Sequence, residues 1–310
     1  MRAAMAPDER MSMGYLEELA GLDGKVAVVV GGASGLGEAS TMALARAGMD
    51  IAVIDRDETK LNERVDEIAR LGRQVVSRLG DARKPEVLDE FFAEITTTFG
   101  KADVLVYCIG GSFWSKFMDS TPSGWDAVMR QNFTGALHST QRVVPLMRNA
   151  GAGSIIYVTS IEAHRAAPGV AVYAAMKAAL TNFAWTLAAE LGPENIRVNT
   201  IAPDIIPTPG MTEMTKAGRN PEEFAAYQEL AAKGYTISIP LQRTGTYDEF
   251  GGAVLFLAGN LSTNTTGSTI HLDGGCLNNS SWFNWGKATG TPHVPASIVK
   301  LLPDEFIGPK

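Results

Sequence analysis

The sequence is poor in the residues that build disulfide frameworks and metal cages. Its 310 residues include two cysteines, Cys108 and Cys276, and neither belongs to a Cys-x-x-Cys arrangement. The four histidines are scattered, with no His-x-x-x-His pair and no neighbouring cysteine pair. A disulfide scaffold is therefore excluded, no metal site is predicted, and the cysteine usage fits a reducing cytoplasm.

Long apolar runs and basic stretches are also missing. Gly, Pro or charged residues break every apolar run before it reaches the roughly 18 residues of a membrane span. The first residues carry acidic side chains such as Glu17 and Glu18 and lack an apolar core, so no signal peptide is predicted. A net charge of -7 and a pI near 5.2, without a Lys/Arg-rich stripe, argue against a nucleic-acid partner.

The composition is that of a soluble globular protein. Hydrophobic residues make up 45% of the chain and charged residues 20%, which is enough for a sizeable core. The length alone allows one large α/β unit or two ordinary domains. The choice between them depends on the order of the expected strands and helices.

Short, continuously apolar segments alternate with helical patterns along most of the chain. Apolar runs without a period of two are typical of strands buried on both faces of a parallel sheet. The expected strands are 26–30, 51–54, 75–79, 104–107, 155–158, 198–201 and 269–272. The expected helices between them are 38–47, 58–71, 86–99, 123–147, 172–191 and 248–258.

This alternation, without a linker or a shift in composition, predicts one α/β domain. Its doubly wound, mostly parallel sheet would have helices on both faces, in three α/β/α layers. The domain should span 22–275, preceded by an arm, 1–21, with one short helix around 15–20. A long segment, 205–242, interrupts the alternation and is expected to be a lid. The aromatic tail, 276–310, should pack on the domain or on a neighbouring subunit.

A glycine-rich turn joins the first expected strand to the first long helix. Glycine lets the backbone approach a pyrophosphate, and a helix N-terminus offers unpaired N–H groups and the positive end of its dipole. A dinucleotide is the expected ligand, whereas the alternative is a turn that needs glycine only for its geometry. The residues predicted to contact the ligand here are Gly31, Ser34, Gly35, Leu36 and Gly37.

An acidic residue ends the second strand, eighteen positions after Gly37. A carboxylate at this point, Asp55, can accept hydrogen bonds from the adenosine ribose and would repel a 2′-phosphate. NAD is therefore favoured over NADP, although Arg56 beside it is a residue that a 2′-phosphate would attract. The alternative for Asp55 is a solvated loop acid.

A tyrosine and a lysine stand four residues apart, at positions 173 and 177. On one helix such residues share a face, so the phenol of Tyr173 and the ammonium of Lys177 can reach the same small volume. Free tyrosine is ionised only to about one part in a thousand at neutral pH, and a nearby positive charge favours the phenolate. The pair suits acid–base catalysis. Taken alone, the spacing also fits an ordinary solvated helix face.

Several motifs together resemble the short-chain dehydrogenase/reductase family in its single-domain, Rossmann-like form, over Leu22 to Gly275. They occur in the family's order: the turn 31–37, Asp81 after the third strand, Asn132, Ser160, Tyr173 with Lys177, the segment 195–203, and the segment 272–275. The resemblance implies catalytic roles for Asn132, Ser160, Tyr173 and Lys177. Tyr173 would exchange the substrate's proton, Ser160 would bind the same oxygen, Lys177 would bind the nicotinamide ribose, and Asn132 would hold a water molecule.

The resemblance also implies further cofactor contacts. Asp81 and Ala82 would lie beside the adenine, and Gly110 would let the cofactor pass the fourth strand. The nicotinamide carboxamide would be touched by Pro203, Ile206 and Thr208; the alternative for these three is an ordinary strand exit.

The chain departs from the family pattern around the expected substrate. Tyr107-Cys108-Ile109-Gly110 replaces the frequent Asn-Asn-Ala-Gly, Met176 a usual serine, and Asp204 a usual glycine. Glu162 is a candidate for binding a polar group of the substrate, or else simply pairs with Arg165. Apolar side chains in two loops suit a bulky lipophilic substrate or pack on one another. They are Phe113, Trp114, Phe117, Met118, Met211, Met214 and Tyr227.

The leading hypothesis is an NAD-dependent oxidoreductase that interconverts a secondary alcohol and a ketone on a fairly hydrophobic substrate. The alternatives are an NADP-dependent 3-oxoacyl-thioester reductase and a dinucleotide-binding sensor or scaffold without turnover. Relatives of this kind are commonly tetramers that pair through helices equivalent to 123–147 and 172–191. A cytoplasmic homotetramer is therefore expected.

Overall fold

The computed structural model describes residues 14–279, and the C-terminal tail from residue 280 onward lies outside them. The strands are β1 (Val26–Val30), β2 (Asp50–Asp55), β3 (Val75–Leu79), β4 (Val104–Tyr107), β5 (Gly153–Val158), β6 (Ile196–Pro203) and β7 (Thr269–Leu272). They form a sheet in the order β3-β2-β1-β4-β5-β6-β7, with every neighbouring pair parallel. The predicted doubly wound sheet is confirmed.

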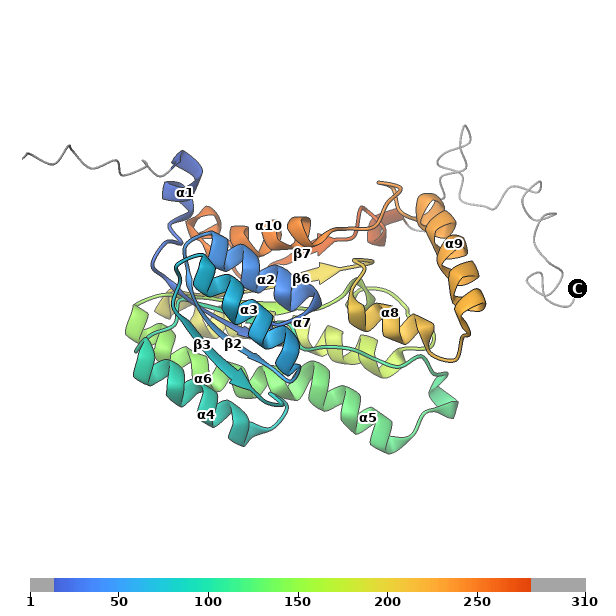
Figure 1. Cartoon of the computed structure of the whole chain (residues 1–310), viewed down its shortest axis with the longest axis horizontal. Coiled ribbons are helices and arrows are strands. Elements are labelled where there is room, and N and C mark those ends of the chain that lie inside the picture. The colour runs from blue at the N-terminus through green and yellow to red at the C-terminus, as the bar shows by residue number, and fades with distance from the viewer. Residues whose placement is uncertain (1–13, 280–310) are drawn as a thin grey trace, which may run out of the picture.

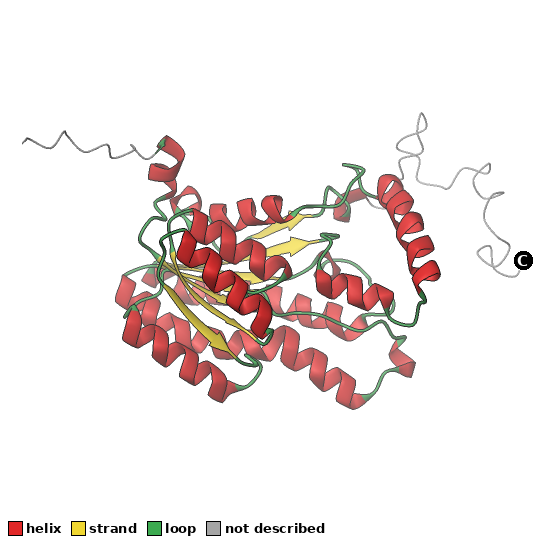
Figure 2. Ribbon diagram, in the orientation of Figure 1, coloured by secondary structure: helices red, strands yellow, loops and turns green. Residues whose placement is uncertain are grey.

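Helices cover both faces of this sheet (Figures 1 and 2). They are α1 (Tyr15–Ala20), α2 (Gly35–Arg46), α3 (Glu58–Arg70), α4 (Pro85–Thr98), α5 (Pro122–Met129), α6 (Gly135–Ala150), α7 (Ala171–Leu191), α8 (Pro209–Lys216), α9 (Pro221–Ser238) and α10 (Tyr247–Ala258). Most begin and end within three residues of their expected limits. The short helix α1 lies where the sequence predicts it.

Alternate residues of the strands enter two separate cores. Val28 and Val30 pack with α4, α6 and α7, whereas Ala27 and Val29 pack with α2, α3 and α10. All five residues of β1 are buried because helices lie on both sides of it. Because both faces of such a strand are buried, its sequence is continuously apolar and does not alternate between apolar and polar residues.

The sequence predicts one helix over 123–147, and the structure corrects this. The helix is interrupted by a π-helical segment, Arg130–Thr134, between α5 and α6. Such a segment widens one turn of the backbone and commonly marks a functional position. Asn132, a predicted catalytic residue, lies inside it.

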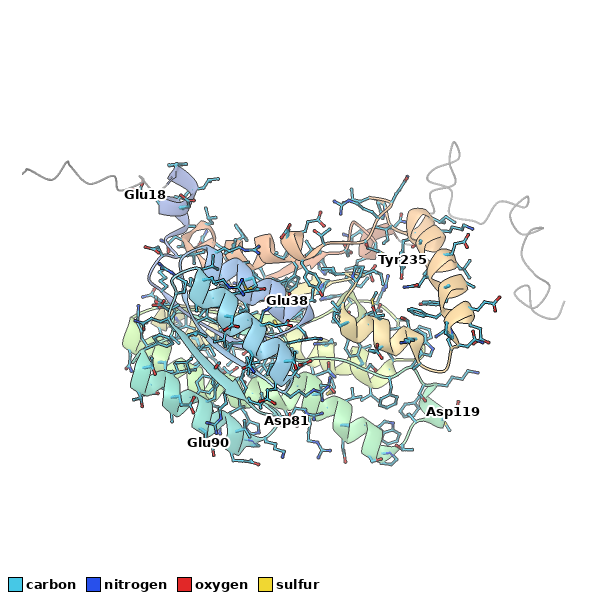
Figure 3. The ribbon with its side chains drawn as sticks, viewed as in Figure 1. Glu18, Glu38, Asp81, Glu90, Asp119 and Tyr235 are labelled. Carbon is cyan, nitrogen blue, oxygen red and sulfur yellow. The ribbon has the colours of Figure 1, made fainter. Side chains whose placement is uncertain are left out.

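The segment predicted as a lid, 205–242, contains two helices. Figure 1 shows α8 and α9 beyond the carboxyl ends of β6 and β7, which is the edge of the sheet where parallel α/β folds bind their ligands. Asn220 and Glu223 form a capping box that starts α9. No residue that the structure assigns a burial in α9 is fully buried, and Tyr235 lies on the side of α9 that faces the rest of the molecule (Figure 3).

Candidate active site

The glycine-rich turn has a shape that only glycine allows. A Cβ atom on Gly37 would overlap the carbonyl oxygen of Gly31, so the first turn of α2 packs directly against the end of β1. Gly35 begins α2 with a φ of 60°. The N–H groups of this first turn have no partners within the helix and lie at the positive end of the helix dipole. The turn therefore fits a pyrophosphate.

Asp55 is joined to this turn. Its Oδ2 accepts a hydrogen bond from the N–H of Ala33 at 3.0 Å, and its Oδ1 accepts from the N–H groups of Arg56 and Asp57. The carboxylate thus lies against the glycine-rich turn at the end of β2. This is the place from which it can reach an adenosine ribose.

Asp81, at the carboxyl end of β3 (Figure 3), is held by an arginine that the sequence analysis missed. The guanidinium of Arg83 donates to both carboxylate oxygens, at 2.8 and 2.7 Å, and this pairing lowers the pKa of Asp81. Ala82 beside it is buried. Both oxygens of the Asp81 carboxylate are therefore bound by Arg83. The predicted contact between Asp81 and the adenine remains a prediction. The sequence signal that could have predicted this ion pair is the spacing of Asp81 and Arg83, which stand two residues apart.

The beginning of the segment 205–242 lies against the glycine-rich turn. A Cβ atom on Gly35 would be 3.4 Å from the Thr208 side chain, which caps α8 by accepting from the N–H of Met211. Ile206 is buried in the core, and Pro203 ends β6. The structure thus brings Thr208 to the glycine-rich turn.

Asn132 is buried, and its amide is fully used. Its Nδ2 donates to the carbonyl oxygens of Gly111 at 2.8 Å and Val128 at 2.9 Å, while its Oδ1 accepts from the N–H of Gly111 at 3.1 Å. A Cβ atom on Gly110 would lie 3.1 Å from this Oδ1 and 2.7 Å from Lys177 Nζ. Gly110 therefore permits the close approach of Asn132 and Lys177.

Tyr107 explains how the unusual end of β4 is accommodated. Its buried hydroxyl donates to the carbonyl oxygen of Gln131, in the π-helical segment, at 3.2 Å. The next residue, Cys108, continues the strand pairing by donating from its N–H to the carbonyl oxygen of Val30. Tyr107 thus supports the segment that carries Asn132, a role that sequence reasoning missed.

Among the buried residues of α7, only Lys177 has a charged side chain. Its Nζ donates to the carbonyl oxygen of Val158 at 2.8 Å and lies 5.7 Å from the centre of the Tyr173 ring. Burial lowers the pKa of Lys177 to about 8, so its positive charge is partly lost near that pH. The short distance between the two side chains confirms that Tyr173 and Lys177 share one face of α7, as their spacing predicts.

Ser160, at the carboxyl end of β5, completes the group. Burial raises the pKa of Tyr173, the hydrogen bond between the Ser160 and Tyr173 hydroxyls lowers it, and the Glu162 carboxylate raises it, so that the net direction is upward. The expectation that Lys177 lowers this pKa therefore remains a prediction. A hydroxyl, a phenol and an ammonium gathered at one edge of the sheet can bind a substrate oxygen and exchange its proton.

The side chains predicted to form the substrate wall differ in exposure: Phe113, Trp114, Phe117 and Met118 are exposed, whereas Met211, Met214 and Tyr227 are half-buried. The Trp114 side chain is 72% exposed, and its indole lies against Gly169, where a Cβ atom would come within 2.6 Å of the ring. Phe117 stacks on Trp125 with ring centres 5.4 Å apart. Trp125 was missed by sequence reasoning. A small cavity beside Tyr173 is lined by Phe113, Val170 and other residues of these loops.

Glu162 forms the pair with Arg165 that the sequence left as an alternative. The Arg165 guanidinium donates to both carboxylate oxygens, at 2.8 and 3.2 Å. Arg165 also lies 3.6 Å from Asp204 and 3.3 Å from Cys276. Within residues 14–279 no group of acidic, histidine and cysteine side chains has the arrangement of a metal site, and no helix is long and apolar enough to cross a membrane.

Comparisons with known proteins identify the family. The family model described as enoyl-(acyl carrier protein) reductase matches residues 31–277. The 3-oxoacyl-[acyl-carrier-protein] reductase FabG of Thermotoga maritima is 34% identical over 256 residues, 83% of this chain and 99% of that protein. An uncharacterized NAD-dependent oxidoreductase of Mycobacterium tuberculosis is 34% identical over 83% of this chain and 97% of its own length.

A solved structure agrees with these matches. The L-sorbose reductase from Gluconobacter frateurii, complexed with NADPH and L-sorbose, has a TM-score of 0.77 and 31% identity, covering 82% of this chain and 97% of that chain. The chain belongs to the short-chain dehydrogenase/reductase family. It is therefore an oxidoreductase that acts on CH–OH groups with a nicotinamide dinucleotide.

Proposed function

We propose that this protein is an NAD-dependent oxidoreductase that interconverts a secondary alcohol and a ketone on a fairly hydrophobic substrate. The observation that supports this most is the position of Tyr173, whose hydroxyl meets Ser160 and whose ring lies 5.7 Å from the Lys177 ammonium. These three residues stand beside a glycine-rich turn that fits a pyrophosphate. When bound there, the dinucleotide supplies or accepts the hydride.

In this proposal, each residue has one task. Ser160 donates a hydrogen bond to the substrate oxygen and orients it. Tyr173 gives a proton to that oxygen during reduction and takes it back during oxidation. Lys177 binds the nicotinamide ribose, and Asn132 holds the water molecule that links Lys177 to solvent. Trp114 and Met211 contact the apolar part of the substrate, and α8 and α9 act as the lid.

The cofactor preference rests on Asp55. Its carboxylate lies against the cofactor turn and would repel a 2′-phosphate, which favours NAD. The cofactor contacts are those predicted from the sequence, with Arg56 beside the ribose and Pro203, Ile206 and Thr208 beside the nicotinamide. Purified protein should bind NADH more tightly than NADPH in parallel fluorescence titrations, and equal or reversed affinities would contradict this preference.

A second candidate is an NADP-dependent 3-oxoacyl-thioester reductase. It is favoured by the match to FabG and by Arg56, whose charge is near enough to Asp81 to lower the pKa of that acid and so lies at the adenosine end of the site. Tighter NADPH binding together with turnover of an acetoacetyl thioester would favour this candidate. A dinucleotide-binding sensor or scaffold is the third possibility and would bind either cofactor without turnover.

The activity is tested by a substrate screen. Hydroxy-lipids, sterols and short polyols are incubated with NAD, and the absorbance of reduced nicotinamide is followed. Turnover that disappears in Tyr173→Phe, a variant that keeps the ring and removes the proton, would support the assignment. Unaltered turnover in Tyr173→Phe would overturn it, and cofactor binding without any turnover would favour the sensor.

We also propose that the protein is a cytoplasmic homotetramer that pairs through α5, α6 and α7. An apolar groove between α6 and α7 supports this, and Leu137, Val144, Phe183 and Leu187 line it. The proposal that the tail packs over the domain or a neighbouring subunit concerns residues outside those described.

A further inference from the structure

A tyrosine at the start of α10 reaches the glycine-rich turn and is not among the site residues predicted from the sequence. The hydroxyl of Tyr247 lies 4.0 Å from the position that a Cβ atom on Gly35 would occupy, and the Thr208 side chain lies 3.4 Å from the same position. Gly35 is the first residue of α2. The phenol therefore lies at the turn that fits a pyrophosphate, together with a residue already predicted to contact the cofactor.

The packing of α10 on α2 explains why Tyr247 reaches this turn. Gly251, four residues after Tyr247, lies so close to α2 that a Cβ atom there would be 3.0 Å from the Ala43 side chain. Figure 1 shows the two helices next to each other, and both pack on the same side of the sheet. One helical turn before Gly251, Tyr247 is level with the first turn of α2. The starts of the two helices thus lie side by side.

The beginning of α10 is fixed by hydrogen bonds on both sides of the tyrosine. Thr246 and Glu249 form a capping box, in which the Thr246 hydroxyl accepts from the N–H of Glu249 at 3.3 Å and the Glu249 carboxylate accepts from the N–H of Thr246 at 2.9 Å. The N–H of Gly245 donates to the carbonyl oxygen of Ile205 at 2.9 Å. The ring of Tyr247 packs against the core. The position of its hydroxyl is therefore set by the fold.

The hydroxyl of Tyr247 is free to act as a donor. It forms no hydrogen bond with any residue of the described range 14–279. Burial raises the pKa of Tyr247, and the Glu38 carboxylate acts in the same direction, so the hydroxyl keeps its proton at neutral pH. The Glu38 carboxylate itself accepts from the guanidinium of Arg64. A protonated phenol at this turn can therefore donate to a phosphate oxygen.

We propose that Tyr247 is a cofactor-binding residue whose hydroxyl donates a hydrogen bond to the pyrophosphate of the bound dinucleotide. The inference rests on the proposed function, in which the glycine-rich turn holds the cofactor. The turn 31–37 contains no lysine or arginine, so its own donors are the neutral N–H groups at the start of α2. A hydroxyl that donates to a charged oxygen forms a short and strong hydrogen bond. Tyr247 thus adds a side-chain donor to a turn that otherwise relies on its backbone.

The test compares the wild type with Tyr247→Phe, which keeps the ring and removes the hydroxyl. NADH, or NADPH if the wild type binds it more tightly, is titrated into each protein, and the fluorescence of the reduced nicotinamide is followed. The dissociation constant should rise by roughly three- to thirtyfold in Tyr247→Phe, because a hydrogen bond to a charged group is lost. Tyr15→Phe, which changes an exposed tyrosine of α1, should bind as the wild type does. An unchanged dissociation constant in Tyr247→Phe would overturn the proposal.

Competition with smaller ligands locates the lost contact. ADP contains a diphosphate and adenosine contains no phosphate, and each is used to displace the bound dinucleotide. In Tyr247→Phe the inhibition constant of ADP should rise by a factor similar to that of the dinucleotide, whereas that of adenosine should stay the same. An equal rise for ADP and adenosine would place the lost contact away from the pyrophosphate, and the proposal would be wrong.

Thermal unfolding separates a binding role from a structural one. Without ligand, Tyr247→Phe should unfold within about 2 °C of the wild type, because no hydrogen bond within the protein is lost. The same concentration of NADH should then raise its unfolding temperature less than that of the wild type. A lower unfolding temperature without ligand, together with equal stabilisation by NADH, would contradict the proposal. If the wild type binds neither NADH nor NADPH, the proposed function fails as well; if both proteins bind equally, only the role of Tyr247 fails.

Discussion

Burial of the Lys177 ammonium is unfavourable for folding. Its pKa falls from 10.5 to about 8, and a displacement of this size corresponds to about 3 kcal/mol of unfavourable burial of the charged form. One hydrogen bond, to the carbonyl oxygen of Val158, stabilises that charge within the protein. The role proposed for Lys177 at the nicotinamide ribose would account for a lysine at this buried position.

Lys177→Met should therefore separate activity from stability. Below pH 8 the folded wild-type protein carries a buried charge, whereas between pH 8 and 10.5 it has released a proton that the unfolded chain still binds. The free energy of unfolding of the wild type should thus rise relative to Lys177→Met, by about 2 kcal/mol between pH 7.5 and 9.5. Activity should fall by about 10²- to 10⁴-fold. Urea unfolding at several pH values measures the first effect.

The control for this prediction is Lys60→Met, which replaces an exposed lysine paired with Asp57. Its difference from the wild type should stay flat across the same pH range. If the difference for Lys177→Met were equally flat, Lys177 would not be titrating in the folded protein as proposed.

At the scale of elements, the start of α2 depends on one close contact. Gly37→Ala would push a methyl group into the carbonyl oxygen of Gly31, so the helix would have to move away from the end of β1. We expect dinucleotide binding to weaken by at least about tenfold, because the pyrophosphate loses its aligned N–H groups. Fluorescence titration with NADH measures this.

A matched glycine in another helix serves as the control. Gly252 of α10 has open space where a Cβ atom would stand. Gly252→Ala should leave NADH binding unchanged and stabilise the helix by roughly 0.5–1 kcal/mol. Unchanged NADH affinity in Gly37→Ala would show that the turn does not hold the cofactor.

The π-helical segment between α5 and α6 depends on Asn132. Replacing Asn132 with Ala removes a buried amide and leaves the backbone groups of Gly111 and Val128 without its hydrogen bonds. The expected loss in the free energy of unfolding is about 2–4 kcal/mol. Asn149→Ala, which removes one hydrogen bond at the surface, should cost less than about 1 kcal/mol. Similar losses in both variants would argue against a special role for the segment.

Across the whole molecule, the sequence predicted the sheet better than the surroundings of the site. Buried strands such as β1 and β4 are visible because both of their faces are apolar, and Tyr173 with Lys177 follows from helical spacing alone. The π-helical segment was not predictable, since Tyr107 and Gln131 are 24 residues apart and meet only in the folded chain. The pair of Arg165 with Glu162 was one of the alternatives that the sequence offered, but its contacts with Asp204 and Cys276 come from distant loops and were not predictable for the same reason.

The assembly of several copies is the property of the whole molecule that most needs a test. In the groove between α6 and α7, Leu187 packs against the core along one edge and is partly exposed. If a second copy covers this groove, Leu187→Glu would bury a carboxylate without a partner, which is strongly unfavourable. Light scattering should then give a mass below that of a tetramer. Leu230→Glu, on the exposed surface of α9, should leave the mass unchanged. A wild-type monomer, or a tetramer that Leu187→Glu leaves intact, would contradict pairing through this face.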